Sequence, residues 1–226
     1  MGPHAFATIP AMKISPRFTP ATLLSRRPAL AAGAVLIAAP WFITSALAQE
    51  SRRATPSQTE GPYYPVLIPA DSDADLLANG NLRYTPSQPL WLEGSVTDLA
   101  GRPLRGALVE IWQCDEKGHY HHPGDGARAD PAFQGFGRSS VNKDGEYRFR
   151  TLRPARYEGR TPHIHVKVKL AQRSLLTTQM YVEGDAHNEA DFLWRRLSAP
   201  DRSALTRPVV ASAQGPKARF DIAVAA

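Results

Sequence analysis

Two histidines spaced two residues apart, His163 and His165, are the side chains best placed to do chemistry together. They begin an alternating run, rich in β-branched residues, that predicts a strand over residues 163–168. Residues i and i+2 of a strand project from the same face, so both imidazoles point to one side. Converging imidazoles are typical of a metal site. Tyr157 and Arg160 precede the pair on a predicted loop and can reach the same point.

The spacing of residues does not by itself identify the other ligands of such a metal site. A His-rich tract at 119–122 also contains Tyr120, but such a tract is by itself typical of a solvated loop. Two phenolates with two imidazoles favour Fe(III), because phenolate oxygens are hard anionic donors that neutralise much of a tripositive charge. A carboxylate from Asp115 or Glu158 beside the two histidines gives instead the facial triad of Fe(II) oxygenases.

Short strands separated by Gly, Pro and Asp turns must position these residues. The expected strands cover residues 89–98, 107–113, 146–151, 163–168, 174–182, 208–210 and 218–224. Residues 142–145 predict a hairpin turn, and residues 185–197 predict one short helix. This pattern predicts an all-β fold, a sandwich or barrel. We expect a β-sandwich of mixed or antiparallel sheets with long loops, and a metal site between loops and strands.

The first 48 residues have the pattern of an export signal. Arg26 and Arg27 precede an apolar run over residues 29–43, and a small-residue cleavage pattern follows at 46–48. The run contains Pro40 and is shorter than the roughly 20 residues needed to span a bilayer. We therefore expect a twin-arginine signal peptide over 1–48 and a mature domain over 49–226, exported folded to the periplasm or beyond. No stable membrane anchor is expected after cleavage.

The charge of the chain does not indicate a nucleic-acid binder. The formal net charge is +6, but the first 48 residues hold four of the 27 basic residues and no acidic residue. The remaining 23 basic and 21 acidic residues leave the rest of the chain nearly neutral. Nucleic-acid binding needs a clustered basic face, so no nucleic-acid partner is expected. Cys114 is the only cysteine in the sequence and cannot form an intrachain disulfide.

Several stretches between residues 59 and 185 resemble, in order, those of the intradiol ring-cleavage dioxygenases. They cover residues 94–101, 103–107, 109–115, 118–120, 135–138, 147–151, 153–154, 160–165 and 179–185. The most specific part is Gly-His-Tyr at 118–120 followed by Tyr157 and Arg-Thr-Pro-His-Ile-His at 160–165. Within the family, Gln-Thr-Glu-Gly-Pro-Tyr at 58–63 resembles the N-terminal motif of the protocatechuate 3,4-dioxygenases.

The resemblance implies a non-haem Fe(III) held by four ligands, Tyr120, Tyr157, His163 and His165. It also implies that the substrate is a small aromatic diol of the protocatechuate type. This substrate is expected to displace Tyr157 from the iron, and Tyr157 is expected to take up a proton. Reaction with O2 is then expected to cleave the ring and give a cis,cis-muconate. Arg160 is expected to stabilise charge on the substrate, Gln179 to support Arg160, and Tyr63 to lie near the ring. The chain is expected to act as a monomer or a homo-oligomer.

One departure from the protocatechuate enzymes is the short connection between Tyr157 and Arg160, which contains only Glu158 and Gly159. The edge of the substrate pocket is therefore expected to differ, and with it the choice of catechol. Two other interpretations remain open at this point. One is a β-sandwich binding module without redox activity, and the other is an Fe(II) extradiol or cupin-like oxygenase.

Overall fold

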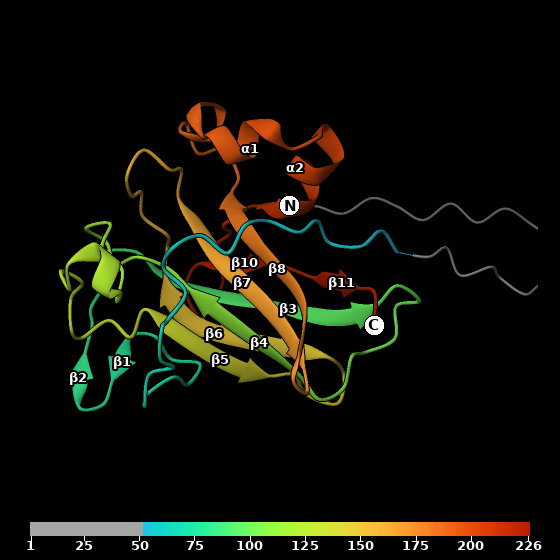
Figure 1. Ribbon diagram of the computed structural model, residues 1–226, viewed down its shortest axis with the longest axis horizontal. Coiled ribbons are helices and arrows are strands. Elements are labelled where there is room, and N and C mark those ends of the chain that lie inside the picture. The colour runs from blue at the N-terminus through green and yellow to red at the C-terminus, as the bar shows by residue number, and fades with distance from the viewer. Residues whose placement is uncertain (1–51) are drawn as a thin grey trace, which may run out of the picture. The chain divides into compact units, whose positions relative to one another are not determined.

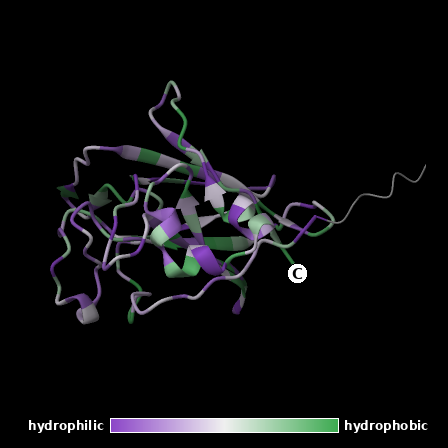
Figure 2. Cartoon of the chain, turned by 90° about the horizontal axis from the view of Figure 1, so that it is seen from above, coloured by the Kyte–Doolittle hydropathy of each residue, from purple (hydrophilic) through white to green (hydrophobic). Residues whose placement is uncertain are grey.

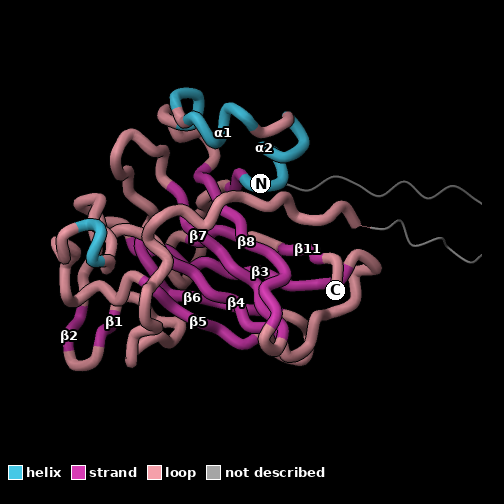
Figure 3. Tube along the Cα trace, in the orientation of Figure 1, coloured by secondary structure: helices cyan, strands magenta, loops and turns pink. Residues whose placement is uncertain are grey.

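The computed structural model describes residues 52–226. The predicted signal peptide, residues 1–48, lies outside these residues. Among the described residues, no helix is long and apolar enough to span a bilayer. The described chain is built from strands and long loops, and its α-helices are short and come late in the sequence (Figures 1 and 3).

Two main sheets form the fold. In the first, β3 (Pro89–Asp98) pairs antiparallel with β6 (Glu146–Leu152) and parallel with β10 (Lys217–Arg219) and β11 (Ile222–Val224). The second has the order β5-β4-β7-β8-β9. Its strands are β4 (Ala107–Trp112), β5 (Phe136–Ser140), β7 (His163–Leu170), β8 (Arg173–Val182) and β9 (Thr206–Arg207). A separate ribbon joins β1 (Ala78–Asn79) to β2 (Leu82–Arg83).

The hydrophobic core joins side chains of both main sheets in one cluster. Strand β6 alternates between exposed and buried residues, and it contributes Tyr147 and Phe149 to the core. Strand β3 contributes Leu90 and Leu92, and β7 contributes Ile164 with the two valines that follow at alternate positions. Figure 2 shows hydrophobic segments within the strands. The predicted all-β sandwich of mixed sheets is confirmed.

The opposite face of β7 is also buried, although its side chains are polar. His163, His165 and Lys167 alternate with the core residues, and each is at most 9% exposed. Residues 52–65, which we call the N-terminal strap, cross in front of β7 and β8 in Figure 1. The backbone N–H of Gln58 donates to Thr177 O at 2.8 Å, and Glu60 forms an ion pair with Lys167. The strap thus covers the outer face of the five-stranded sheet.

The predicted single helix over 185–197 is wrong in detail. The structure has a 3-10 turn, η2 (Asn188–Ala190), followed by two α-helices, α1 (Phe192–Arg196) and α2 (Ala199–Leu205). Helix α1 begins only at Phe192 because the Asp191 side chain accepts from the backbone N–H of Leu193 and Trp194 as an N-cap. Ser198 caps α2 in the same way, with a proline in its first turn, a start signal that the sequence reading missed.

Three other local predictions need correction. The turn at 142–145 forms, but it joins β5 to β6, which lie in different sheets, so it is not a hairpin. The strand expected at 208–210 is absent from the described residues, where β9 ends at Arg207 and Val210 makes only an isolated bridge to Lys217. The strand expected at 218–224 is split into β10 and β11 at Phe220 and Asp221.

Gly94 lies where β3 exchanges its pairing with β10 for its pairing with β11. A Cβ atom at this position would be 2.1 Å from the backbone oxygen of Phe220. That oxygen also accepts a hydrogen bond from the Tyr147 hydroxyl at 2.5 Å, so it has little freedom to move. The sequence needs glycine here because another backbone approaches β3 closely.

We therefore expect Gly94→Ala to lower the free energy of unfolding by about 2–3 kcal/mol through overpacking. Urea unfolding of the variant and the parent protein measures this change. Ser140→Ala, at the exposed end of β5, is the control and is expected to change stability little. An unfolding midpoint for Gly94→Ala equal to that of Ser140→Ala would show that the close approach of the Phe220 backbone does not require glycine at position 94.

Candidate metal centre and active site

Four aromatic side chains from three segments converge at one end of the outer face of β7. His163 and His165 come from β7, Tyr157 from the loop before it, and Tyr120 from the loop after β4. The ring centroids of His163 and His165 are 4.8 Å apart, and those of Tyr120 and Tyr157 are 5.0 Å apart. Between the two pairs, the centroids of Tyr157 and His163 are 5.6 Å apart, and those of Tyr120 and His165 are 6.2 Å apart. All four side chains are buried. The structure thus brings together the four residues that the sequence resemblance singled out.

The two imidazoles meet through their Nε2 atoms, which are 3.2 Å apart. His163 Nδ1 lies 2.6 Å from the backbone oxygen of Thr161. Only a protonated Nδ1 can donate to that oxygen, so the Nε2 atom of neutral His163 carries a lone pair. Burial lowers the pKa of His163 to about 4 and the pKa of His165 well below its usual range. Both rings are therefore neutral near pH 7, as metal-ligating imidazoles must be.

The Tyr120 hydroxyl is buried and has no hydrogen-bond partner among residues 52–226. Burial raises the pKa of Tyr120 well above its usual range, and burial also raises the pKa of Tyr157, with Arg160 opposing the rise. An unpartnered buried hydroxyl is costly and calls for an ion or a water. A bound cation would satisfy this oxygen and favour the phenolate. The donor set, two neutral imidazoles and two phenols, therefore fits a hard trivalent ion such as Fe(III).

The carboxylates of the alternative Fe(II) triad lie elsewhere. Asp115 is buried and accepts hydrogen bonds from the backbone N–H groups of Lys117, His119 and Asp130. Glu158 is exposed, and the Tyr63 hydroxyl lies 3.5 Å from its carboxylate. In the described part of the chain, no three His, Cys, Asp or Glu side chains are arranged to hold a metal ion. The geometry therefore favours the tyrosine–histidine set.

Two buried aspartates fold the loop that presents Tyr120. Asp115 accepts three backbone N–H groups, as described above, and Asp125 accepts the backbone N–H of Tyr120 at 2.7 Å. Asp125 lies in η1 (Pro123–Asp125) and forms an ion pair with Arg128. The three histidines of the tract make contacts within this loop. His119 faces Asp125, His121 lies 3.1 Å from the backbone oxygen of Asp130, and His122 accepts from Gly124 N. Tyr120 alone among these four points into the cluster.

Trp112 holds the ring of His165 in place from the neighbouring strand. The two residues are partners in the β4–β7 register. Their rings stack with centroids 4.7 Å apart and planes inclined by 8°. Beyond Trp112, the Lys167 ammonium lies 3.7 Å from the centre of the Tyr64 ring in the strap. This stack restricts the rotation of His165, so its Nε2 atom faces His163.

Arg160 is fixed by a buried network that the sequence revealed only in part. Its Nε donates to Asp191 Oδ2 at 2.7 Å, and its Nη2 donates to Gln179 Oε1 at 2.8 Å. Gln179 also donates to Thr59 O in the strap at 3.0 Å. The expected support of Arg160 by Gln179 is thus present as a contact. Asp191 was missed, because its sequence signal is that of a helix N-cap, which says nothing of a distant arginine.

Asp191 also fixes the start of the histidine strand. Its Oδ2 accepts the backbone N–H of Thr161 at 2.9 Å, and the backbone oxygen of Thr161 in turn contacts His163 Nδ1. Burial disfavours the charged carboxylate of Asp191. Hydrogen bonds from Arg160 and from the backbone N–H groups of Trp194 and Thr161 outweigh burial and hold its pKa below its usual range. One carboxylate therefore links helix α1, Arg160 and the first histidine.

We expect Asp191→Asn to destabilise the metal-free protein by about 3 kcal/mol at pH 7, because it leaves the Arg160 charge buried without its partner. The folded pKa of Asp191 lies below the unfolded value of about 3.9, so this stabilisation is present above that value and is lost as pH falls through the folded pKa. The stability gap between parent and variant should shrink below about pH 4.

Urea unfolding of both proteins at pH 7 and at pH 3 measures the gap, with Asp144→Asn at an exposed carboxylate as the control. A gap of the same size at both pH values would show that the charge of Asp191 is not what stabilises the fold.

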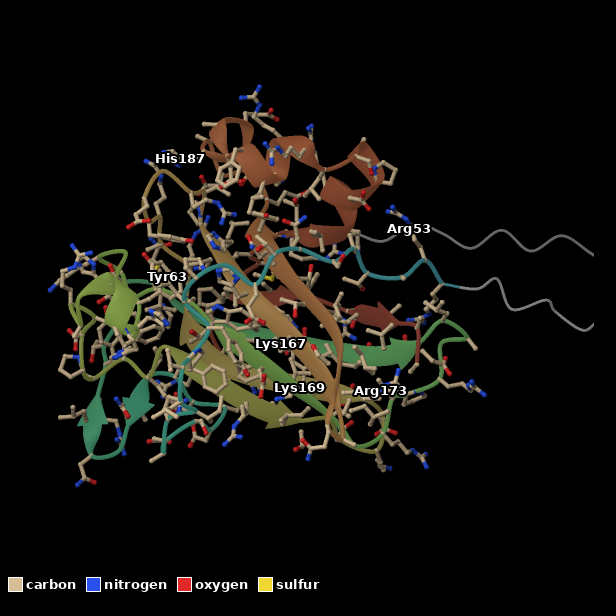
Figure 4. The ribbon with its side chains drawn as sticks, viewed as in Figure 1. Arg53, Tyr63, Lys167, Lys169, Arg173 and His187 are labelled. Carbon is tan, nitrogen blue, oxygen red and sulfur yellow. The ribbon has the colours of Figure 1, made fainter. Side chains whose placement is uncertain are left out.

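Tyr63 lies against the two tyrosines of the cluster. Its ring stacks on Tyr120 with centroids 4.7 Å apart and meets Tyr157 edge-on at 5.7 Å. Figure 4 shows Tyr63 beside the loops at one end of the sheet, with Lys167 and Lys169 further along β7. The strap therefore places Tyr63 next to the candidate metal ligands. The position expected for Tyr63, near the ring of the substrate, stays a prediction.

A pocket of about 500 Å³ opens beside Tyr157. It is lined by the strap (Thr59, Gly61 and Pro62), by Tyr157, Glu158 and Arg160, and by the start of α1 (Phe192 and Leu193). Its volume is in the range of small-molecule sites. A ring bound in it can approach Tyr157 and Arg160 from the open side.

Known proteins share this fold. The dioxygenase domain of a dioxygenase carbohydrate-binding protein fusion from Streptomyces sp. SirexAA-E matches with a TM-score of 0.60 and 34% identity, over 76% of this chain and 99% of that one. An intradiol ring-cleavage dioxygenase from Tetranychus urticae has a TM-score of 0.63 at 21% identity, over 76% and 94% of the two chains. The second likeness shows the fold alone.

Sequence comparisons agree with the structural ones. The family model described as Dioxygenase matches residues 59–224. The protocatechuate 3,4-dioxygenase beta chain of Burkholderia cepacia is 38% identical over 124 residues, which cover 50% of this chain and 53% of that protein. The hydroxyquinol 1,2-dioxygenase of Corynebacterium glutamicum is 34% identical over 120 residues, 45% and 38% of the two. The matched region spans about half or less of both relatives. The chain belongs to the intradiol ring-cleavage dioxygenase family.

Proposed function

We propose that this chain is a non-haem Fe(III)-dependent intradiol dioxygenase, which cleaves a catechol with O2 to a cis,cis-muconate. The observation that carries the proposal is the convergence of two neutral imidazoles and two phenols on one buried point, where the Tyr120 hydroxyl has no partner among residues 52–226. Membership of the family supports it. The reactants are a small aromatic diol and O2, and the proposal includes no nucleic-acid partner.

Tyr120, Tyr157, His163 and His165 hold the iron in this proposal. The chemistry that bound Fe(III) supplies is Lewis-acid activation, which withdraws electron density from a chelated catechol and prepares the ring for reaction with O2. His163 is held in the correct tautomer by Thr161 O, and His165 is held in orientation by Trp112. These contacts fix both donors before a metal arrives, which reduces the reorganisation needed on binding.

Tyr157 accepts a proton from the substrate in this proposal. It is the ligand closest to the pocket, it lies on a turn rather than within a strand, and it lines the pocket wall. A loop side chain can leave a ligand position without breaking a strand ladder. Its phenolate oxygen is basic, since burial raises the pKa of Tyr157, and it can take the proton that a catechol hydroxyl loses.

Arg160 stabilises negative charge on the substrate. Its guanidinium lines the pocket next to Tyr157 and is held rigidly by Asp191 and Gln179. A preorganised cation in a water-poor site stabilises developing charge without a cost of reorganisation. Tyr63 of the strap packs on the ring of Tyr120 and so helps to bury this ligand.

The sequence resemblance singled out catechols of the protocatechuate type, and we keep protocatechuate as the reference substrate for testing. Export through the twin-arginine route to the periplasm or beyond belongs to the same proposal and rests on the Arg26–Arg27 pattern. In this proposal the chain acts as a monomer or a homo-oligomer. A cofactor loaded before export would suit a route that carries folded proteins.

The first test is colour. Iron-loaded parent protein is expected to be red-brown, because tyrosinate ligands transfer charge to Fe(III). Tyr157→Phe should weaken and shift the visible band and lower kcat by at least about 100-fold, since the base and one ligand are lost. Tyr84→Phe, a tyrosine outside the cluster that packs on Phe133, is the matched control. A colourless iron-loaded protein would indicate a binding module or an Fe(II) site.

The second test is the product. Parent protein incubated with catechol, protocatechuate and hydroxyquinol under ¹⁸O2 should consume oxygen and give a ring opened between the two hydroxyl-bearing carbons, with both labelled atoms retained. Mass spectrometry of the product checks both points. Cleavage beside the diol, which gives a semialdehyde, would contradict the assignment and favour the extradiol alternative.

A further inference from the structure

The turn between Tyr157 and Arg160 holds a glutamate in an unfavourable backbone conformation. Arg160 N donates to Tyr157 O at 2.7 Å, and the two central residues, Glu158 and Gly159, have φ angles of 42° and 78°. Both φ angles are positive, as in a type I′ turn. Glycine adopts this conformation freely and asparagine tolerates it, whereas a glutamate is strained there. A strained residue beside a candidate active site suggests that its side chain is used.

The Glu158 side chain faces the pocket that would receive the substrate. It lines this pocket with Arg160 as the other charged residue, and the remaining lining residues are uncharged. The charge of Arg160 is already balanced, because Asp191 pairs with it in a buried contact of 2.7 Å. Glu158 has no ion-pair partner among residues 52–226, and its polar contact is the Tyr63 hydroxyl. Among the residues that line the pocket, Glu158 therefore carries the charge that no ion pair balances.

The lining of the same pocket also includes apolar side chains. Phe192 lines the pocket at the start of α1 and is 54% exposed, which is unusual for a large aromatic side chain. Pro62 of the strap lines the same pocket. These two side chains can pack on an uncharged ring substituent that extends from the metal site towards solvent. No lining residue offers an unbalanced cation to a carboxylate.

We infer that Glu158 determines specificity by charge: it favours catechols with an uncharged or cationic ring substituent and disfavours those with a carboxylate, such as protocatechuate. This inference rests on the proposed function, because it assumes that a catechol binds beside Tyr157. The carboxylate of an anionic catechol would share the pocket mouth with Glu158, and like charges in close contact repel. The uncharged substituent instead meets Phe192 and Pro62.

An isosteric pair of ligands tests the inference. Protocatechuate and 3,4-dihydroxybenzamide have the same size and differ in charge. Both are titrated anaerobically into iron-loaded, full-length protein, and the change in the visible spectrum gives each Kd. The ratio of the two Kd values is then compared between the parent, Glu158→Gln and Glu158→Asn. Comparing ratios cancels any intrinsic difference between the ligands in their affinity for iron.

The ratio of the protocatechuate Kd to the amide Kd is expected to fall by about fivefold in both variants, as expected for two unit charges about 4 Å apart in water. Asparagine suits the left-handed turn position, so Glu158→Asn keeps the fold even where Glu158→Gln does not. Glu183→Gln, at an exposed carboxylate outside this pocket, should leave the ratio unchanged. In the parent protein, the ratio should also fall as salt is added.

A ratio that is the same in the parent and in both Glu158 variants would overturn the inference while leaving the proposed function intact. Ligand binding with the expected ratios but without ring cleavage in air would overturn the proposed function alone. A failure of both ligands to bind would overturn both.

Discussion

The outer face of β7 is buried although it is polar, and the rest of the site depends on this constraint. Burying a polar group without a partner costs free energy, so each side chain on this face needs a specific contact. Lys167 pairs with Glu60 of the strap, and His163 contacts Thr161 O. The facing Nε2 atoms of the two histidines and the nearby hydroxyl of Tyr120 are groups that a metal ion would satisfy, whereas His165 Nδ1 has no hydrogen-bond partner among residues 52–226. The metal of the proposed function would thus also stabilise this buried polar face.

Asp191 extends this constraint to the C-terminal part of the chain. Its carboxylate caps α1, pairs with Arg160 and accepts Thr161 N, so the helix start, the charged pocket residue and the histidine strand are held as one unit. The strap is tied to the same unit through Gln179, which contacts both Arg160 and Thr59. The pocket lies where these segments meet, and a shift of one segment would move the others. Rigidity of this kind suits the proposed function, in which Arg160 must stay close to Tyr157 and the substrate.

The sequence was sufficient for the parts of the site that depend on short-range periodicity. The shared face of His163 and His165 follows from the strand period, and the alternation of β6 follows from its pattern of polar and apolar residues. The choice of Tyr120 from a tract of four possible ligands needed the family resemblance. In the structure, the three neighbouring histidines make contacts within their own loop, whereas Tyr120 packs against Tyr157 and His165.

Long-range contacts could not be read from the sequence. Asp191 reads as a helix cap, and its partner Arg160 is 31 residues away. Nothing in the local pattern shows that the strap lies over β7, or that Tyr64 reaches Glu110 at a distance of 2.9 Å. The second helix and the break between β10 and β11 were missed for different reasons. Helix α2 had a start signal in the sequence, an N-cap serine with a proline in the first turn. The break between β10 and β11 depends on the Phe220 backbone lying against Gly94, which only the tertiary structure shows.

The central claim is that two phenols and two imidazoles of this chain form one iron site. A crystal structure of the iron-loaded protein, with anomalous data collected on both sides of the iron absorption edge, tests it most directly. The account predicts a single iron peak within bonding distance of the hydroxyl oxygens of Tyr120 and Tyr157 and the Nε2 atoms of His163 and His165. An iron peak elsewhere, or a stoichiometric metal at this point that is not iron, would contradict it.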